Sequence, residues 1–267
     1  MQQMLATLPT GDVGSLVMLG AIYGLAAIFS GLSGFGFSAI GCLSLIALPP
    51  QLAIAVLMAL SLVTQTSSFA SLWPELREHL LPMSRRDGVL PYLAGGVLGL
   101  PIGLGALEVF RASELLVGLG VLLMSYSIWS LAKPAALVLD GGAQGLQSAV
   151  LVGVVGGIVG GFSAFPGSAL VVWNGLVGTS KERGRALTQP YILFMQIAGL
   201  ALFLGLHPQV FGGPFLSLFV AALPVALLGN CLGVSIFHRT GDLGYRKVTL
   251  VALGLAGLGL VFKVALP

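Results

Sequence analysis

Two short motifs place serine, glycine and phenylalanine inside stretches that are otherwise apolar. Residues 33–38 read Ser-Gly-Phe-Gly-Phe-Ser, and residues 163–168 read Ser-Ala-Phe-Pro-Gly-Ser. Glycine permits positive φ angles, which we expect at Gly34 and Gly36, while proline lacks an amide hydrogen and favours the first turn of a helix. Each motif is therefore predicted to end one helix and to start a new, short one.

The start of each new helix could bind an anion. The first amide groups of a helix have no partner inside it and lie at the positive end of its dipole, so they can hold negative charge without a basic side chain. Serines at matching positions, Ser33 with Ser163 and Ser38 with Ser168, would add hydroxyl donors. The alternative is that the glycines only allow close helix packing and that the serines bond to their own backbone.

Six further polar residues lie well inside apolar runs, namely Thr64, Gln65, Thr66, Gln189, Gln196 and Asn230, and we single out Thr66, Gln196 and Asn230. An unpaired amide or hydroxyl in an apolar medium costs roughly 2–7 kcal/mol. We expect these side chains to line a cavity or, alternatively, to form hydrogen bonds between helices. The residues expected to bind substrate are Ser33, Gly34, Phe35, Gly36, Phe37, Ser38, Thr66, Ser163, Ala164, Phe165, Pro166, Gly167, Ser168, Gln196 and Asn230.

The composition indicates the medium in which these residues lie. Of 267 residues, 57% are hydrophobic and 8% are charged, whereas about 25% of the residues of a soluble domain are charged. This excludes a water-soluble fold. The net charge of +3 comes from bases in separate short loops, so we expect the lipid bilayer and no nucleic acid as a partner. The chain is predicted to be an all-α, multi-pass membrane protein.

The apolar runs divide the chain into two halves of the same plan, since a bilayer core needs about 20 apolar residues per helix. The first repeat, 1–131, has a broken hairpin at 13–48 and spans at 51–72, 89–107 and 113–131; the second, 146–267, has a hairpin at 146–178 and spans at 186–206, 214–237 and 248–266. A shift of 130 residues pairs the serine, phenylalanine and serine of one motif with those of the other. The chain is interpreted as an internal duplication.

The basic residues predict the orientation of the two halves. Ten of the twelve bases fall in the loops 73–88, 132–145, 179–185 and 238–247. Because Lys and Arg in short loops accumulate in the cytoplasm, we place these loops there, including the linker 132–145, with both termini outside. The first hairpin is then re-entrant from outside and the second from inside. The halves are predicted to be inverted repeats, as in many secondary transporters.

Other chemistries receive less support from the residues. No Asp, Glu, Lys or Arg falls clearly in the middle of a predicted span, so a buried proton relay has no candidate and the anion would be held without a basic side chain. The sequence has no nucleotide-binding loop and no Cys/His zinc spacing, so we expect no cofactor and no metal. A passive anion channel remains an alternative.

An enzymatic interpretation depends on Ser33. Residues 31–34 read Gly-Leu-Ser-Gly, which resembles the motif of rhomboid intramembrane serine proteases. Such a protease needs a histidine base on a later helix. His207 precedes a proline in a loop and His238 ends a span, so neither is well placed, and we expect no enzyme activity.

Residues 30–38 and 160–168 resemble the glycine-rich motifs that open each half of the sulfite exporter TauE/SafE family. The resemblance covers nearly the whole chain. It implies a permease of the cell membrane that carries sulfite or another small organosulfur or organic anion. Two departures concern the substrate more than the fold: Ala164 stands where glycine is usual, and residues 41–42 and 172–173 lack the proline often found there. A homodimer is an open alternative to a monomer.

Overall fold

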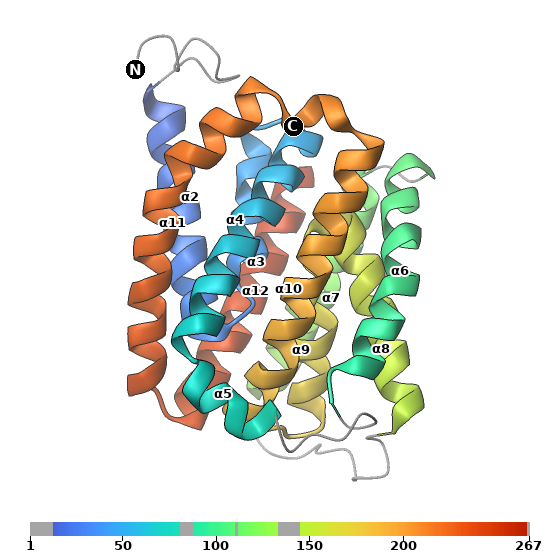
Figure 1. The fold of residues 1–267 in the computed structure, drawn as a ribbon, viewed down its shortest axis with the longest axis vertical. Coiled ribbons are helices and arrows are strands. Elements are labelled where there is room, and N and C mark those ends of the chain that lie inside the picture. Colours follow the sequence, from blue (N-terminus) through green and yellow to red (C-terminus); the bar gives the residue numbers. More distant parts are fainter. Residues whose placement is uncertain (1–12, 81–87, 110–111, 133–144, 266–267) are drawn as a thin grey trace.

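The computed structural model describes residues 13–80, 88–109, 112–132 and 145–265, and the secondary structure in these ranges is entirely helical (Figure 1). The elements are α2 (Val13–Ser33), α3 (Phe37–Gly41), η1 (Cys42–Ile46), α4 (Pro50–Ser71), α5 (Trp73–Leu80), α6 (Leu90–Val109), α7 (Ala112–Ala132), α8 (Leu146–Ser163), α9 (Gly167–Leu176), α10 (Lys181–Leu206), η3 (Pro208–Phe211), α11 (Gly213–Arg239) and α12 (Asp242–Ala265). The predicted all-α fold is confirmed. Most of the predicted linker 132–145, and residues 81–87 of the loop before α6, lie outside the described residues.

Five described helices, α2, α4, α8, α10 and α11, are long and apolar enough to cross a bilayer. Shorter apolar stretches occur in α6, α7 and α12. Large hydrophobic side chains are exposed along these helices, for example Val17, Leu98, Leu151 and Leu228. An apolar outer surface of this extent suits lipid rather than water. The chain is therefore a multi-pass membrane protein.

The structure differs from the sequence prediction in two segments, the start of α10 and the loop that precedes α6. The span predicted at 186–206 belongs to a longer helix, α10, which begins at Lys181 because the Ser180 hydroxyl caps it by accepting from the Arg183 amide at 3.4 Å. The predicted loop 73–88 contains the short helix α5, whose buried residue Leu76 packs with Leu72. Hydropathy alone detects neither feature, because both segments are rich in charged residues.

Both motifs interrupt the helices, as the sequence predicts. α2 ends before Gly34, which has φ +81°, and α8 ends at Ala164, which has φ +57°. Both angles are in the left-handed region, which terminates a helix. Gly36 was also expected to need a positive φ, but its φ is −72°, because the reversal of direction is completed at Gly34.

The long helix of each break packs closely on a helix from the other half of the chain. α2 lies against α11, where a Cβ atom on Gly31 would collide with the Asn230 carbonyl oxygen and one on Gly233 with the Ile28 carbonyl oxygen. α8 lies against α6, where a Cβ atom on Gly99 would collide with the Val154 carbonyl oxygen. Glycine is required at these contacts because the two backbones touch.

The remaining long pair, α7 and α12, also joins the two halves, and the Ser127 hydroxyl donates to the Leu250 carbonyl oxygen at 2.7 Å. Figure 1 shows α5, the start of α10 and the junction between α11 and α12 at one end of the helix bundle. The start of α2 and the end of α12 lie at the opposite end. The described basic residues Arg77, Lys181, Arg183 and Arg239 belong to elements at the first of these ends.

Candidate functional site

The two breaks meet in the interior of the bundle. Phe35 and Phe165, at the centres of the two motifs, stack with ring centroids 6.0 Å apart and ring planes inclined by 15°. A Cβ atom on Gly167 would lie 3.4 Å from the Phe35 Cβ atom. All residues of 33–38 and 163–168 are buried. The structure thus brings together two motifs that are 130 residues apart in the sequence.

The serine hydroxyls of the breaks mainly serve their own backbone in this conformation. Ser33 Oγ donates to the Phe29 carbonyl oxygen at 2.6 Å and accepts from the Gly36 amide at 3.1 Å. Ser163 Oγ donates to the Val159 carbonyl oxygen at 2.6 Å. Ser168 Oγ donates to the Phe165 carbonyl oxygen at 3.1 Å. These bonds help to end one helix and to turn the chain, which is the structural alternative left open for the serines.

The short helices that follow the breaks differ in length. α3 has five residues and continues as the 3₁₀ helix η1, whereas α9 has ten residues and follows Pro166. Phe37 is fully buried and stacks on Tyr23 with ring centroids 6.3 Å apart, and Ser38 is buried in the same turn. Phe37 therefore belongs to the hydrophobic core, and the longer α9 presents the stronger helix dipole of the two.

A glutamine holds the left-handed residue of each break. Gln65 Nε2 donates to the Gly34 carbonyl oxygen at 2.8 Å, and Gln196 Nε2 donates to the Ala164 carbonyl oxygen at 3.1 Å. Gln189 Nε2 in turn donates to Gln65 Oε1 at 3.2 Å. The same type of hydrogen bond therefore occurs in both halves. Its two residues are 31 positions apart in the first half and 32 positions apart in the second.

This pair corrects one predicted position. The shift of 130 residues matches Gln196 with Thr66, but Thr66 is exposed and its hydroxyl donates to the Leu62 carbonyl oxygen of its own helix at 2.8 Å. Gln65, one residue earlier, occupies the matching place, because the two helices differ by one residue in register. Asn230 is buried and its Oδ1 accepts from the Ser68 hydroxyl at 2.8 Å, so it joins α11 to α4.

Arg185 is a buried basic residue at the first break. Its side chain is 1% exposed, and its Nη1 and Nη2 atoms donate to the carbonyl oxygens of Leu32 and Gly31 at 3.1 and 2.7 Å. The guanidinium carbon lies 4.3 Å from the centre of the Phe237 ring. The sequence prediction assigned this residue to a cytoplasmic loop and expected no basic side chain at the site, which is wrong, because α10 begins earlier. The capping serine at 180 is the sequence signal that could have revealed it.

A cavity of about 390 Å³ extends from the start of α10 to the first break. Ser33 and Phe35 are the predicted site residues that border it. The other bordering residues are Tyr126, Val171, Asn174, Gly175, Gly178, Thr179, Ser180, Lys181, Gly184, Thr188, Thr249, Leu250 and Leu253. The volume is typical of a small-molecule site. Its polar lining comes mainly from the α9–α10 junction, which the sequence prediction did not include.

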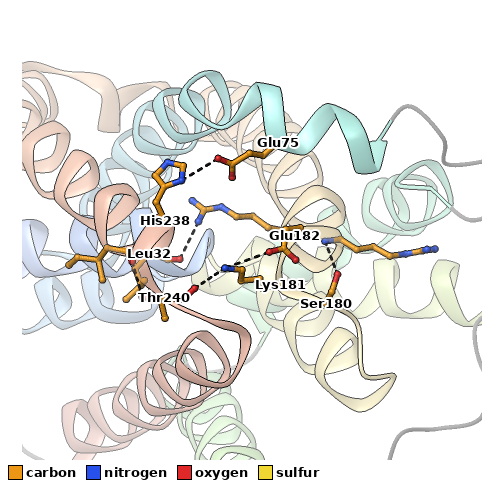
Figure 2. Close-up of polar contacts among 10 residues, drawn as sticks. Leu32, Glu75, Ser180, Lys181, Glu182, His238 and Thr240 are labelled. Atoms are coloured by element: carbon orange, nitrogen blue, oxygen red, sulfur yellow. Dashed lines mark hydrogen bonds and ion pairs between the residues drawn. The ribbon is translucent and has the colours of Figure 1, made fainter.

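Charged and polar groups link the helices beside this cavity. Figure 2 shows Lys181 between Thr240 and Glu182, with Nζ 2.7 Å from the Thr240 carbonyl oxygen and 3.5 Å from Glu182 Oε1. His238 and Glu75 lie nearby and join α11 to α5, with Nδ1 and Oε1 3.2 Å apart. Within the described ranges, no three His, Cys, Asp or Glu side chains gather where they could hold a metal ion.

We expect an exchange of glycine and alanine to destabilise the protein at Gly34 and to have little effect at Ala164. Gly34→Ala should lower the free energy of unfolding by at least about 1–2 kcal/mol, because an L-residue is disfavoured at φ +81°. The new Cβ atom would also lie 3.2 Å from Arg185. Ala164→Gly should change stability by less than about 1 kcal/mol, since the relief of backbone strain offsets the loss of a buried methyl group. Thermal unfolding of both proteins in detergent measures the difference, and equal losses would contradict it.

The two glutamines should contribute unequally to stability. Replacement of Gln196 by leucine removes the donor to the Ala164 carbonyl oxygen, which is expected to cost about 0.6–1.7 kcal/mol. Gln65→Leu should cost more, because it also removes the acceptor of the Gln189 amide. Unfolding curves give the stability, and anion uptake per folded molecule tests transport separately. A stable Gln196→Leu protein with reduced uptake would show that Gln196 acts on the substrate instead.

Comparison with known proteins gives one family. The model of the family described as Sulfite exporter TauE/SafE matches residues 19–260 of the chain. This range contains both breaks, the cavity and all five of the long apolar helices apart from the first residues of α2. No curated protein matches the chain.

Proposed function

Because the chain belongs to the sulfite exporter TauE/SafE family, we propose that it carries a small anion, such as sulfite or an organosulfur or organic acid anion, across the cell membrane. This family is a family of membrane transporters and not of enzymes. The observation that carries the proposal for the site is the cavity that ends at Ser33 and Phe35, where the two breaks meet. The transported anion and the surrounding lipid are the partners.

Within this proposal the anion passes between the breaks at 33–38 and 163–168. The amide groups at the start of α9 carry the positive end of a helix dipole. The space beside Gly167 is taken by Ile192, whose Cδ1 atom would lie 2.5 Å from a Cβ atom there, so this side chain has to move for an anion to approach. The stacked rings of Phe35 and Phe165 have to separate for passage. The hydrogen bond from Gln196 to the Ala164 carbonyl oxygen of the second break supports the proposal that Gln196 lies beside the anion.

The two halves, 1–131 and 146–267, are proposed to be inverted repeats with re-entrant hairpins. Three observations support this arrangement. The α2–α11 contact has a counterpart in the α8–α6 contact. The glutamine bonds to Gly34 and Ala164 recur in both halves. The described basic loops lie at one end of the bundle. Inverted repeats allow the site to open to each side in turn.

Cysteine labelling of intact cells tests this topology. In a background without the natural cysteines at 42 and 231, single cysteines at Arg77 and Arg183 should both react only after a reagent enters the cytoplasm. If one of the two reacts from outside, the halves are not inverted.

Transport itself is tested with purified protein in liposomes. Radiolabelled sulfite and a labelled sulfonate should enter with saturable kinetics, and unlabelled anion on the far side should accelerate the exchange. A passive channel, the main alternative, would give uptake without saturation and without exchange. Proteolysis of membrane substrates is not expected, because Ser33 Oγ bonds to backbone while His238 pairs with Glu75 and His207 packs on Phe203. Mass measurement in detergent decides between monomer and homodimer.

A further inference from the structure

One wall of the cavity carries polar side chains that are almost fully buried. Asn174, Thr188 and Thr249 border it with exposed fractions of 9%, 4% and 8%. They come from three helices, α9, α10 and α12. None of the three belongs to either break, so this wall is distinct from the two motifs.

The hydroxyl group of Thr188 can donate a hydrogen bond to a ligand in the cavity. Asn174 Nδ2 donates to Thr188 Oγ1 at 3.1 Å, and the same amide contacts the Gly184 carbonyl oxygen at 3.4 Å. A hydroxyl oxygen that accepts one bond keeps its own proton for another acceptor. Among the described residues, no acceptor takes that proton. An anion in the cavity would be such an acceptor, and the bond from Asn174 would strengthen the donation.

The hydroxyl group of Thr249 also lacks a hydrogen-bond acceptor among the described residues. Its Oγ1 atom is buried and has no hydrogen-bond partner in the described part of the chain. A buried hydroxyl without a partner costs about 1–3 kcal/mol. Thr249 also borders the cavity, so a ligand bound there lies beside this hydroxyl group. A bound ligand would satisfy a group that the protein leaves unsatisfied.

The mouth of the cavity lies at the start of a long helix. Thr179, Ser180 and Lys181 border it, and α10, which begins here, is 26 residues long. Its first amide groups carry the positive end of a long helix dipole. The Lys181 side chain borders the same mouth and is 17% exposed, with its ammonium paired to Glu182 Oε1 at 3.5 Å. A negatively charged ligand is therefore attracted into the cavity at this end.

Another part of the lining is apolar, and the space is large. Phe35, Val171, Leu250 and Leu253 make up this apolar wall. A volume of about 390 Å³ corresponds to roughly a dozen water molecules at about 30 Å³ each. A bare sulfite ion fills only a small part of such a space and leaves the apolar wall in contact with water.

We propose that this cavity binds an organic oxyanion, a sulfonate or carboxylate with a short apolar chain, in preference to an inorganic anion. The charged group of the ligand contacts the hydroxyls of Thr188 and Thr249, and the apolar chain of the ligand packs on Phe35, Leu250 and Leu253. This inference rests on the proposed function and names the preferred substrate and, besides Phe35, binding residues that lie outside the two motifs.

Calorimetric titration of the full-length protein in nanodiscs tests it with methanesulfonate, butanesulfonate and uncharged 1-butanol. Butanesulfonate should bind at least tenfold more tightly than methanesulfonate, since each fully buried methylene improves affinity about fourfold. Butanol should bind weakly, because it lacks the charge. Equal affinities for the two sulfonates would overturn the proposal.

Three valine substitutions locate the site. Thr188→Val and Thr249→Val should each weaken butanesulfonate binding, by about tenfold for Thr188. Thr64→Val is the matched control, because Thr64 is equally buried but its hydroxyl bonds to the Leu60 carbonyl oxygen of its own helix at 3.0 Å. Melting curves without ligand verify that each variant folds. Unchanged affinity in both cavity variants refutes the site.

Exchange assays in liposomes separate this inference from the proposed function. If the wild type exchanges sulfonates while the cavity variants bind like the wild type, the site is wrong and the transport function stands. If butanesulfonate binding depends on Thr188 but no anion is transported, the site stands and the proposed function fails.

Discussion

A Gly99→Leu protein is expected to unfold in detergent under conditions in which the wild type is stable, with a loss of at least about 3 kcal/mol. The Cβ position of this residue is already occupied by the carbonyl oxygen of Val154 on α8. Backbone atoms cannot move aside as a flexible side chain can, so α6 and α8 would have to separate. Thermal unfolding followed by circular dichroism measures the effect.

Gly105 provides the control on the same helix. A Cβ atom there meets nothing within 4 Å, and the residue is exposed. Gly105→Leu should be neutral or stabilising, because leucine favours a helix over glycine by up to about 1 kcal/mol. If both variants lose stability equally, helix flexibility rather than backbone contact explains the glycines of α6.

Arg185→Met is expected to have the second largest effect. The carbonyl oxygens of Gly31 and Leu32 would lose their buried donor, at about 1–3 kcal/mol each. Arg185→Lys should recover only part of this loss, because an ammonium cannot match the planar fork of a guanidinium. Unfolding in denaturant gives the values.

Arg183 is the matched residue for this test, since it lies in the same first turns of α10 with its side chain exposed. Arg183→Met should change stability by less than about 0.5 kcal/mol. An equal loss in the two methionine variants would mean that overall charge at this end, and not the contact with α2, stabilises the fold.

The features that could be predicted from the sequence depend on local chemistry. Glycine and proline in the two motifs have few functions other than to turn or break a helix, and the breaks occur where these residues are. The apolar runs likewise indicate helices in lipid. Both inferences need only the residue and its neighbours in the sequence.

The features that could not be predicted depend on contacts between distant segments. Thr66 and Gln65 are equally polar neighbours on one helix, and only packing decides that Gln65 faces the break. In the sequence Arg185 resembles a loop residue, but α10 begins at the Ser180 cap and therefore includes Arg185. Asn174, Thr188 and Thr249 are ordinary residues of apolar helices, and no spacing rule relates α9, α10 and α12.

The exchange of partners between the halves has a consequence for synthesis. α8 emerges from the ribosome soon after α6, so that glycine interface can close early. α2 must wait for α11, which is made about 180 residues later. At roughly 5–20 residues per second this delay is on the order of tens of seconds. During that time the glycine face of α2 is without its partner α11, so this contact, like that of α12 with α7, forms late in synthesis.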